Sequence, residues 1–293
     1  MRRAQVSLQE LVRAAAGLAV AGTLLLGAAC AKFETLPYDP VAPVPQRAIM
    51  HRGAGNEPGF HQNTLEAVIY GSTVLDGAEF DIQLSKDDTL WLGHDNEVLD
   101  CAGAAIGCFQ DLTDAQVQAV ATCPDGTHYD RLDTVLQYVS VSFPTKGYSF
   151  DVKGQYCGLR DIPEMMRAMA SEADRLVRTY GMEGRVETES DSREFLVQIR
   201  DLKSPVASLV VSLGDIEGPL YTAWYYGAAG ISFKYAPESE PLTRSVVDGI
   251  HGAGFHIAVW TIDTPEDIAA VWATGADVIQ TDNPDFYSHV PPP

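Results

Sequence analysis

Positive charge is scarce in this chain. Its 293 residues include 20 Lys and Arg against 40 Asp and Glu, so the formal net charge is -20, and the pI is near 4.5. Such a protein would be repelled by a phosphate backbone, which argues against nucleic acid as a partner. An acidic surface of this kind usually reflects solubility.

The apolar run near the start of the chain is too short to span a membrane as a helix. The run that follows Arg2 and Arg3 covers about residues 14–29, whereas a spanning helix needs about 20 residues. Its length and position are typical of a signal-peptide core. The run ends in Leu26-Gly27-Ala28-Ala29-Cys30, which resembles a bacterial lipoprotein cleavage site. We therefore expect an exported protein with a signal peptide over 1–30 and a lipid anchor at Cys30, with ordinary secretion as the alternative.

Cysteine is rare, with five residues in the whole chain. Apart from Cys30, the number left is even, which suits disulfides in an exported protein. These four are Cys101, Cys108, Cys123 and Cys157. They permit three pairings, and we expect Cys101 with Cys108 in a small loop and Cys123 with Cys157. The absence of C-x-x-C spacing argues against a zinc site.

Residues 47–293 have the length of one (β/α)8 barrel, and a tether with four prolines over 31–46 would precede them. Apolar, β-branched-rich segments alternate there with helical patterns. The expected strands lie near 48–51, 78–82, 148–152, 185–189, 208–212, 230–233, 256–260 and 277–280. Helices are expected near 63–75, 162–180, 192–202, 242–253 and 265–273. This alternation predicts an α/β fold with a parallel sheet closed into a TIM barrel.

One connection is too long for a simple loop. Residues 96–146, after the second expected strand, predict a small insertion or lid, with helices near 113–120 and 132–139. An insertion at this place would shape a pocket beside the barrel rim.

Two histidines and two carboxylates form a pattern that suits metal-assisted cleavage of a phosphodiester. Glu79 and Asp81 are two residues apart in an expected strand, so their side chains point to the same face. Carboxylates this close repel each other unless a cation lies between them, and oxygen ligands favour Mg²⁺ or Ca²⁺. His51 and His94 could supply the base and the acid, because histidine titrates near neutrality.

Further motifs follow in a fixed order. They are His51-Arg52-Gly53, Gln62-Asn63-Thr64, Glu79-Phe80-Asp81-Ile82-Gln83-Leu84-Ser85-Lys86-Asp87, His94-Asp95, Phe150-Asp151-Val152-Lys153, Val259-Trp260-Thr261-Ile262-Asp263 and Thr281-Asp282-Asn283-Pro284. This series, from about 48 to 286, resembles the glycerophosphodiester phosphodiesterase family, which is related to the spider-venom phospholipases D.

The resemblance implies metal-dependent hydrolysis of glycerophosphodiesters to glycerol 3-phosphate and an alcohol. It also implies roles for eight of the motif residues. Glu79, Asp81 and Asp151 would bind Ca²⁺ or Mg²⁺, His51 and His94 would be the acid and base, Arg52 and Lys153 would bind phosphate, and Trp260 would line the substrate pocket.

Two positions depart from the family pattern, because Gln62 and Asp151 each stand where the family has glutamate. Asp151, together with Cys101 and Cys108 shortly after His94, resembles the spider-venom enzymes. A lysophospholipase D or sphingomyelinase-D-like activity at a membrane is therefore the alternative. The lost charge at Gln62 leaves a third possibility, a surface lipoprotein that binds a ligand without catalysis.

Overall fold

The computed structural model describes residues 45–290 apart from 121–122, 124–127, 155–156 and 239–240. The expected signal peptide, its Cys30 and almost all of the expected tether lie outside the described residues. Among the residues that are described, no helix is both long and apolar enough to cross a membrane.

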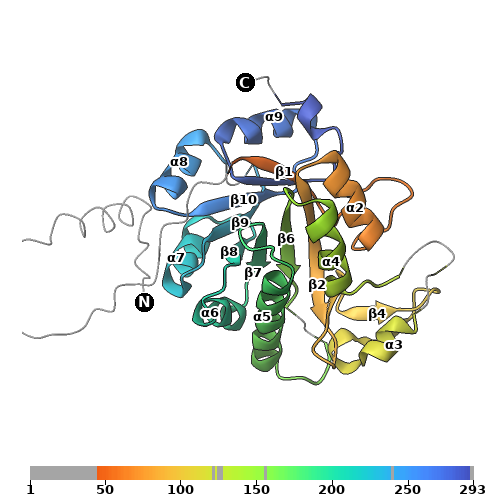
Figure 1. Cartoon of the computed structure of the whole chain (residues 1–293). Coiled ribbons are helices and arrows are strands. Elements are labelled where there is room, and N and C mark those ends of the chain that lie inside the picture. The colour runs from red at the N-terminus through yellow and green to blue at the C-terminus, as the bar shows by residue number, and fades with distance from the viewer. Residues whose placement is uncertain (1–44, 121–122, 124–127, 155–156, 239–240, 291–293) are drawn as a thin grey trace, which may run out of the picture.

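Eight parallel strands close into a barrel, which confirms the TIM-barrel prediction (Figure 1). Met50 of the first strand pairs with Ala78 of the second, and Arg47 of the first pairs with Val278 of the last, which closes the ring. The barrel strands are β1 (Arg47–Met50), β2 (Gly77–Leu84), β6 (Gly147–Val152), β7 (Val186–Ser190), β8 (Ala207–Ser212), β9 (Gly230–Lys234), β10 (His256–Trp260) and β11 (Val278–Thr281).

Helices surround the barrel and follow its strands (Figure 1). Several begin at a Ser, Thr or Asp whose side chain accepts a hydrogen bond from a backbone N–H in the first turn, as Thr64 does for α2 and Ser192 for α6. The surrounding helices are α2 (Leu65–Val74), α4 (Leu132–Ser142), α5 (Ile162–Thr179), α6 (Arg193–Asp201), α7 (Glu217–Tyr226), α8 (Arg244–Gly252) and α9 (Pro265–Thr274), and a 3-10 turn, η2 (Phe286–Ser288), follows the last strand.

Helix α7 is absent from the sequence prediction. It carries Gly218 and Pro219 near its start, which weaken a helical pattern. Its apolar residues also lie on both sides, because Leu220 is buried while Tyr221 and Tyr225 are exposed. A helix without a single apolar stripe gives little periodic signal.

The alternation of side chains along each strand separates an apolar layer from a polar one. In β2, Phe80 and Ile82 pack in the core between the strands and the helices. Glu79, Asp81 and Gln83 point the opposite way, into the barrel, and are buried there as well. The alternation along β2 therefore places Glu79 and Asp81 inside the barrel, while Phe80 and Ile82 hold the strand against the helices.

A small outer unit lies beside the barrel after β2. Strand β3 (Leu90–Leu92) pairs antiparallel with β2. The outer unit consists of a hairpin of β4 (Glu97–Leu99) and β5 (Ala105–Cys108), a 3-10 turn η1 (Phe109–Asp111) and α3 (Asp114–Gln118). It has its own apolar core around Trp91, Val98 and Phe109. Helix α4, from the same segment of the sequence, packs instead on the barrel core.

The four cysteines form two disulfides, but the expected pairing is wrong. Cys101 pairs with Cys123, and Cys108 pairs with Cys157. The hairpin explains the difference: Cys101 follows β4 near the turn, whereas Cys108 ends β5 opposite Glu97, at the open end of the hairpin. The two residues that are close in sequence are therefore separated by the length of the hairpin.

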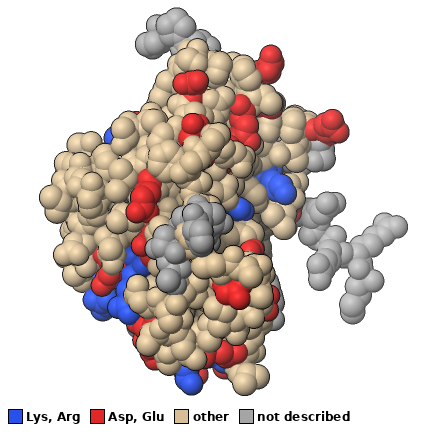
Figure 2. Space-filling model, turned by 90° about the vertical axis from the view of Figure 1, so that its right-hand side faces the viewer, with Lys and Arg blue, Asp and Glu red and all other residues tan. Residues whose placement is uncertain are grey.

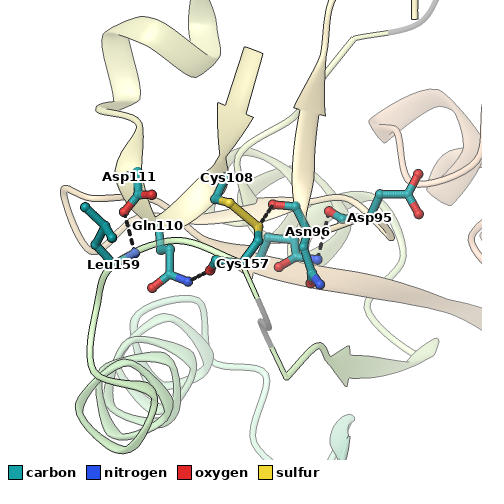
Figure 3. Close-up of a disulfide and its surroundings, with 8 residues drawn as sticks. Asp95, Asn96, Cys108, Gln110, Asp111, Cys157 and Leu159 are labelled. Carbon is teal, nitrogen blue, oxygen red and sulfur yellow. Dashed lines mark hydrogen bonds between the residues drawn. A yellow bond between two sulfur atoms is a disulfide. The ribbon is translucent and has the colours of Figure 1, made fainter. Parts of the chain in front are cut away.

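The Cys108–Cys157 disulfide links the outer unit to the connection between β6 and α5 (Figure 3). The Sγ atom of Cys157 lies 3.5 Å from the carbonyl oxygen of Asn96, and Gln110 donates a side-chain hydrogen bond to the carbonyl of Cys157. Asn96 is two residues beyond His94. The disulfide thus braces the segment that carries His94 against the segment that follows Lys153.

We expect non-reducing peptide mapping to recover one cross-linked peptide with Cys101 and Cys123 and another with Cys108 and Cys157. Replacing both cysteines of either pair by serine should lower the free energy of unfolding by about 2–4 kcal/mol, because each disulfide restricts the unfolded chain. A peptide that joins Cys101 to Cys108 would contradict the observed hairpin geometry.

Candidate active site

The register of three neighbouring strands brings acidic residues together at one end of the barrel. Asp81 of β2 is paired with Asp151 of β6, and Asp151 is paired in turn with Glu189 of β7. Glu79 lies one pleat deeper on β2. These positions are at the carboxyl ends of the strands, where TIM barrels carry their active sites.

Glu79, Asp81 and Asp151 form a cluster that could hold a metal ion. Each offers a carboxylate oxygen, and the three oxygens lie within 4.8 Å of one another. Glu79 and Asp81 are almost completely buried, at 2% and 1% exposure. Oxygen donors at this spacing suit a hard divalent cation such as Mg²⁺ or Ca²⁺. Asp151 fits the cluster although its side chain is one methylene shorter than glutamate.

Two cations lie against the same carboxylates. Lys153 Nζ is 2.8 Å from Asp81 Oδ1 and also donates to Asp151 Oδ2. Arg52 Nε is 3.4 Å from Asp81 Oδ2, and the backbone N–H of Arg52 donates to Glu79 Oε2 over 2.8 Å. Asp81 is therefore well neutralised, whereas Glu79 receives a backbone donor and no cation among the residues that the structure describes.

Because their surroundings differ, the pKa values of Glu79 and Asp81 are shifted in opposite directions. Burial raises the pKa of Glu79 well above its usual value, and the charges of Asp81 and Asp151 raise it further. Burial also acts on Asp81, but Lys153 and Arg52 outweigh it, so the pKa of Asp81 is lowered. The pKa of Asp151 is raised, because its burial outweighs the attraction of Lys153. A bound cation would relieve the repulsion around Glu79.

The loop after β1 forms hydrogen bonds to the carboxylate cluster. Arg52 and Asn63 adopt left-handed backbone conformations, with φ of 49° and 60°, which side chains other than glycine visit rarely. Asn63 Nδ2 donates to Asp81 Oδ2 and the N–H of Asp81 donates to Asn63 Oδ1, over 2.7 and 2.9 Å. Gln62 accepts from Arg52 and donates to the carbonyl of Gly55. Asn63 was given no role from sequence, although it lies within a motif.

Each of the two histidines has a carboxylate on Nδ1. His51 Nδ1 is 2.8 Å from Asp282 Oδ1 after β11, and His94 Nδ1 is 2.9 Å from Asp95 Oδ1. The N–H of Asp282 donates to Asp263 Oδ1 over 2.7 Å, which fixes its position. A carboxylate on Nδ1 orients an imidazole and leaves Nε2 for a reacting group. Asp282 thus contacts His51 as well as shaping the turn.

Trp260 ends β10 and is partly buried. Its ring centroid is 5.6 Å from Lys234 Nζ. Its indole Nε1 is buried and has no hydrogen-bond partner among the described residues. Trp260 therefore lies at the same rim as the other motif residues, beside Lys234.

Glu189 of β7 is a buried acid that none of the sequence motifs includes. It is 3% exposed and accepts side-chain hydrogen bonds from Ser149, Ser232 and Gln280 on three other strands. Burial, together with the charge of Asp151, raises the pKa of Glu189 to about 8. The bonds tie four barrel strands together beside the carboxylate cluster.

A cavity of about 590 Å³ opens beside the cluster, between the loop after β1 and the segment from His94 to Glu97. Arg52, Asn63 and His94 line its inner end. The cavity is large enough for a small organic ligand.

Replacing Glu79 by glutamine should stabilise the metal-free protein at neutral pH. The raised pKa means that an ionised Glu79 is costly in the folded state at pH 7, whereas below pH 4 the residue is protonated whether folded or unfolded. We expect Glu79→Gln to raise the free energy of unfolding by about 1–3 kcal/mol at pH 7 in chelator, and by much less near pH 4. Thermal unfolding of the variant and the wild type at the two pH values measures both differences in stability.

If Glu79 holds a metal ion, Mg²⁺ or Ca²⁺ should raise the Tm of the wild type, and the same variant should lose this increase because one of the three carboxylates of the cluster is removed. A variant that is less stable than the wild type in chelator at pH 7 would contradict the described crowding of carboxylates.

The sequence and the fold of the chain are similar to those of known proteins. A glycerophosphodiester phosphodiesterase from Caldanaerobacter subterraneus is 25% identical over 244 residues, which are 81% of this chain and 94% of that protein. The fold is also similar to two solved structures. One, a putative glycerophosphoryl diester phosphodiesterase from Silicibacter pomeroyi, has a TM-score of 0.66 and 22% identity over 84% of this chain and 92% of its own.

The other, an Oleispira antarctica phosphodiesterase in complex with sn-glycerol-3-phosphate, has a TM-score of 0.67 and 16% identity over 84% of this chain and 96% of its own. The model of the Glycerophosphoryl diester phosphodiesterase family matches residues 51–286, which include both histidines and the whole carboxylate cluster. The chain therefore belongs to the glycerophosphoryl diester phosphodiesterase family.

Proposed function

We propose that this protein hydrolyses glycerophosphodiesters to glycerol 3-phosphate and an alcohol, with a divalent metal ion and two histidines. One observation carries the proposal: three carboxylates that could hold a metal lie at the barrel rim with two histidines, each held on Nδ1 by a carboxylate. The Oleispira phosphodiesterase, whose fold is similar, is in complex with the product sn-glycerol-3-phosphate.

Glu79, Asp81 and Asp151 would hold the metal ion. A bound Mg²⁺ or Ca²⁺ supplies positive charge that stabilises a phosphoryl oxygen during the reaction. Arg52 and Lys153 already lie against the same carboxylates, and their charges would attract the phosphate of the substrate. Trp260, at the end of β10, would pack against the substrate beside the phosphate.

His51 and His94 would move the protons. One imidazole would take the proton of the attacking hydroxyl group, which by resemblance to the family is the neighbouring hydroxyl of the glycerol, and the other would give a proton to the leaving oxygen, so that the alcohol leaves and a cyclic glycerol phosphate remains. Water would then open the cyclic phosphate to glycerol 3-phosphate, with the acid and base roles of the two imidazoles exchanged. Asp282 and Asp95, on the Nδ1 atoms, would keep each Nε2 available and stabilise the imidazolium form.

The activity should depend on a divalent cation. We expect the full-length protein to release glycerol 3-phosphate from glycerophosphoglycerol or glycerophosphocholine, to lose this activity in EDTA, and to regain it with Mg²⁺ or Ca²⁺. An enzyme-coupled assay of glycerol 3-phosphate measures the release. Full activity after exhaustive chelation would contradict the role of the carboxylate cluster.

Removal of either histidine should abolish most of the turnover. We expect His51→Ala and His94→Ala each to lower kcat by about 10²-fold or more, which is the usual contribution of a general acid or base. Circular dichroism and thermal unfolding should remain close to those of the wild type. His289→Ala is the matched control, since that histidine lies outside the site, and near-normal kcat in either site variant would contradict the assignment.

A lysophospholipase D or sphingomyelinase-D-like activity is the second candidate. Asp151 favours it, but the small loop expected between Cys101 and Cys108 does not form, because these residues pair elsewhere. Choline release from lysophosphatidylcholine compared with glycerophosphocholine separates the two activities. A binding module without activity, suggested by Gln62, would show no hydrolysis and no metal binding by calorimetry.

We also propose that the protein is exported. Its two disulfides persist in an oxidising compartment, and the sequence of residues 1–30 favours a signal peptide with lipidation at Cys30. A lipid anchor would hold the catalytic domain at a membrane through the tether over 31–46.

A further inference from the structure

Helix α7 carries aromatic side chains that the barrel does not cover. Tyr221 and Tyr225 are 49% and 58% exposed and lie one turn apart, with ring centroids separated by 6.3 Å. The ring of Trp224 lies 5.7 Å from that of Tyr221, and Tyr226 packs edge to face on Tyr225 with 4.9 Å between the centroids. We call these four side chains the α7 aromatic face.

The α7 aromatic face rests on the packed core. Trp224 and Tyr226 are partly buried and pack against the apolar cluster between the strands and the helices, so they support the two exposed rings that they contact. The guanidinium of Arg193 at the start of α6 lies 5.9 Å from the centroid of Tyr226, which places positive charge at the border of the face. Contiguous exposed apolar side chains commonly mark a binding surface. This one suits an apolar ligand that also carries negative charge.

The tether over 31–46 has a sequence pattern that fits such a face. Pro37, Pro40 and Pro43 stand at every third position. A polyproline II helix has three residues per turn, so in that conformation the three proline rings would lie along one edge. Domains that recognise proline-rich segments bind this edge in grooves lined by aromatic side chains, because the stiff segment loses little conformational entropy.

The chain enters the barrel from the side on which α7 lies. Gln46, just before β1, donates a side-chain hydrogen bond to the carbonyl of Trp272 on α9 over 3.0 Å. Helices α9, α8 and α7 follow one another around this side of the barrel (Figure 1). Trp272 and Tyr225 each lie in the last turn of their helix, and therefore at the same end of the barrel.

The tether is long enough to reach α7. Neighbouring packed helices lie about 8–10 Å apart, so α7 is roughly 20 Å beyond α9. A polyproline II segment rises about 3.1 Å per residue, which places Pro40 about 19 Å and Pro37 about 28 Å from Gln46. Both prolines could therefore contact the α7 aromatic face.

Charge also favours the α7 side over the opposite side of the molecule. Figure 2 shows that opposite side, with α2 and the outer unit, where acidic side chains are spread over the surface and basic ones lie in a few separate places. The tether contains Glu34 and Asp39 against one cation, Lys32. An acidic surface would repel it, whereas Arg193 would attract Asp39.

We propose that the tether of this chain docks on the α7 aromatic face through the prolines at every third position. The inference goes beyond the catalytic function and does not depend on it. Docking from Pro37 onward leaves only residues 31–36 between Cys30 and the barrel, a length of at most about 25 Å. A lipid anchor at Cys30 would then hold the α7 side of the barrel toward the membrane, instead of letting the barrel turn on a long flexible chain.

Photo-cross-linking of the full-length protein, purified in detergent, tests the docking. The variant Tyr225→p-benzoylphenylalanine keeps an aromatic ring on α7 and reacts with C–H bonds in contact with it. Trypsin cuts after lysine and arginine, so the tether and α7 fall in separate peptides, 33–47 and 204–234. We expect irradiation to join these two peptides. Tyr138→p-benzoylphenylalanine is the matched control, since Tyr138 is 43% exposed on α4, and it should not react with 33–47.

The spacing of the prolines can be tested in the same assay. Combining Pro37→Ala, Pro40→Ala and Pro43→Ala keeps the length and charge of the tether but removes the rings from the proposed edge. We expect the cross-link yield to fall about fivefold or more, because both the ring contacts and the stiffness of the segment are lost. Pro45→Ala, which lies outside the three-residue spacing, should leave the yield nearly unchanged. The Tm of every variant should match that of the wild type.

Other occupants of the face would give different products. A mixture of ¹⁵N-labelled and unlabelled protein distinguishes a link within one molecule from a link between two copies, and a link between copies would overturn the proposal in favour of self-association. Protein in phosphatidylcholine vesicles that reacts with lipid at position 225, and not with 33–47, would show that the face contacts the membrane instead. Equal yields from the triple proline variant and Pro45→Ala would also overturn the proposal. None of these outcomes depends on phosphodiester hydrolysis, so the proposed function is tested separately.

Discussion

The crowding of three carboxylates at one end of the barrel, two of them buried, is the constraint on which the rest of the site depends. Glu79, Asp81 and Asp151 are brought within 4.8 Å by the register of β2 and β6 and by the alternation of side chains along each strand. Such a cluster is unfavourable unless cations compensate it. Lys153 and Arg52 compensate Asp81, and the remaining negative charge at Glu79 is what suits the cluster to a divalent ion.

The groups around the cluster come from opposite parts of the chain. His51 follows β1 and is held by Asp282 after β11, while His94 precedes the outer unit and is held by Asp95. The Cys108–Cys157 disulfide braces the latter region against the connection that follows Lys153. The barrel therefore supplies the three carboxylates that could hold a metal ion and one histidine, and the added segment supplies the second histidine and one wall of the cavity.

Charge is distributed according to the chemistry that the site would perform. A protein with a net charge of -20 repels anions over most of its surface, yet the proposed substrate has an anionic phosphate. Arg52 and Lys153 provide positive charge only where the phosphate would bind, and a metal ion would add to it.

The sequence by itself determined the eight strands, most of the helices and the motif residues at the rim. The reason is that these depend on local properties: the alternation along a strand, the caps of helices such as Thr64, and the spacing of Glu79 and Asp81. Helix α7 was not predicted because its apolar residues do not form a single stripe along the helix.

Only the tertiary structure decided which distant groups meet. Asn63 bonds to Asp81, Asp282 orients His51, and Glu189 lies buried among three strands, because ring closure and strand register bring together residues far apart in the chain. The disulfide pairing was likewise decided by the β4–β5 hairpin, which moves Cys101 away from Cys108 although they are close in sequence. Spacing along a chain fixes contacts within an element, but contacts between elements follow from how those elements pack.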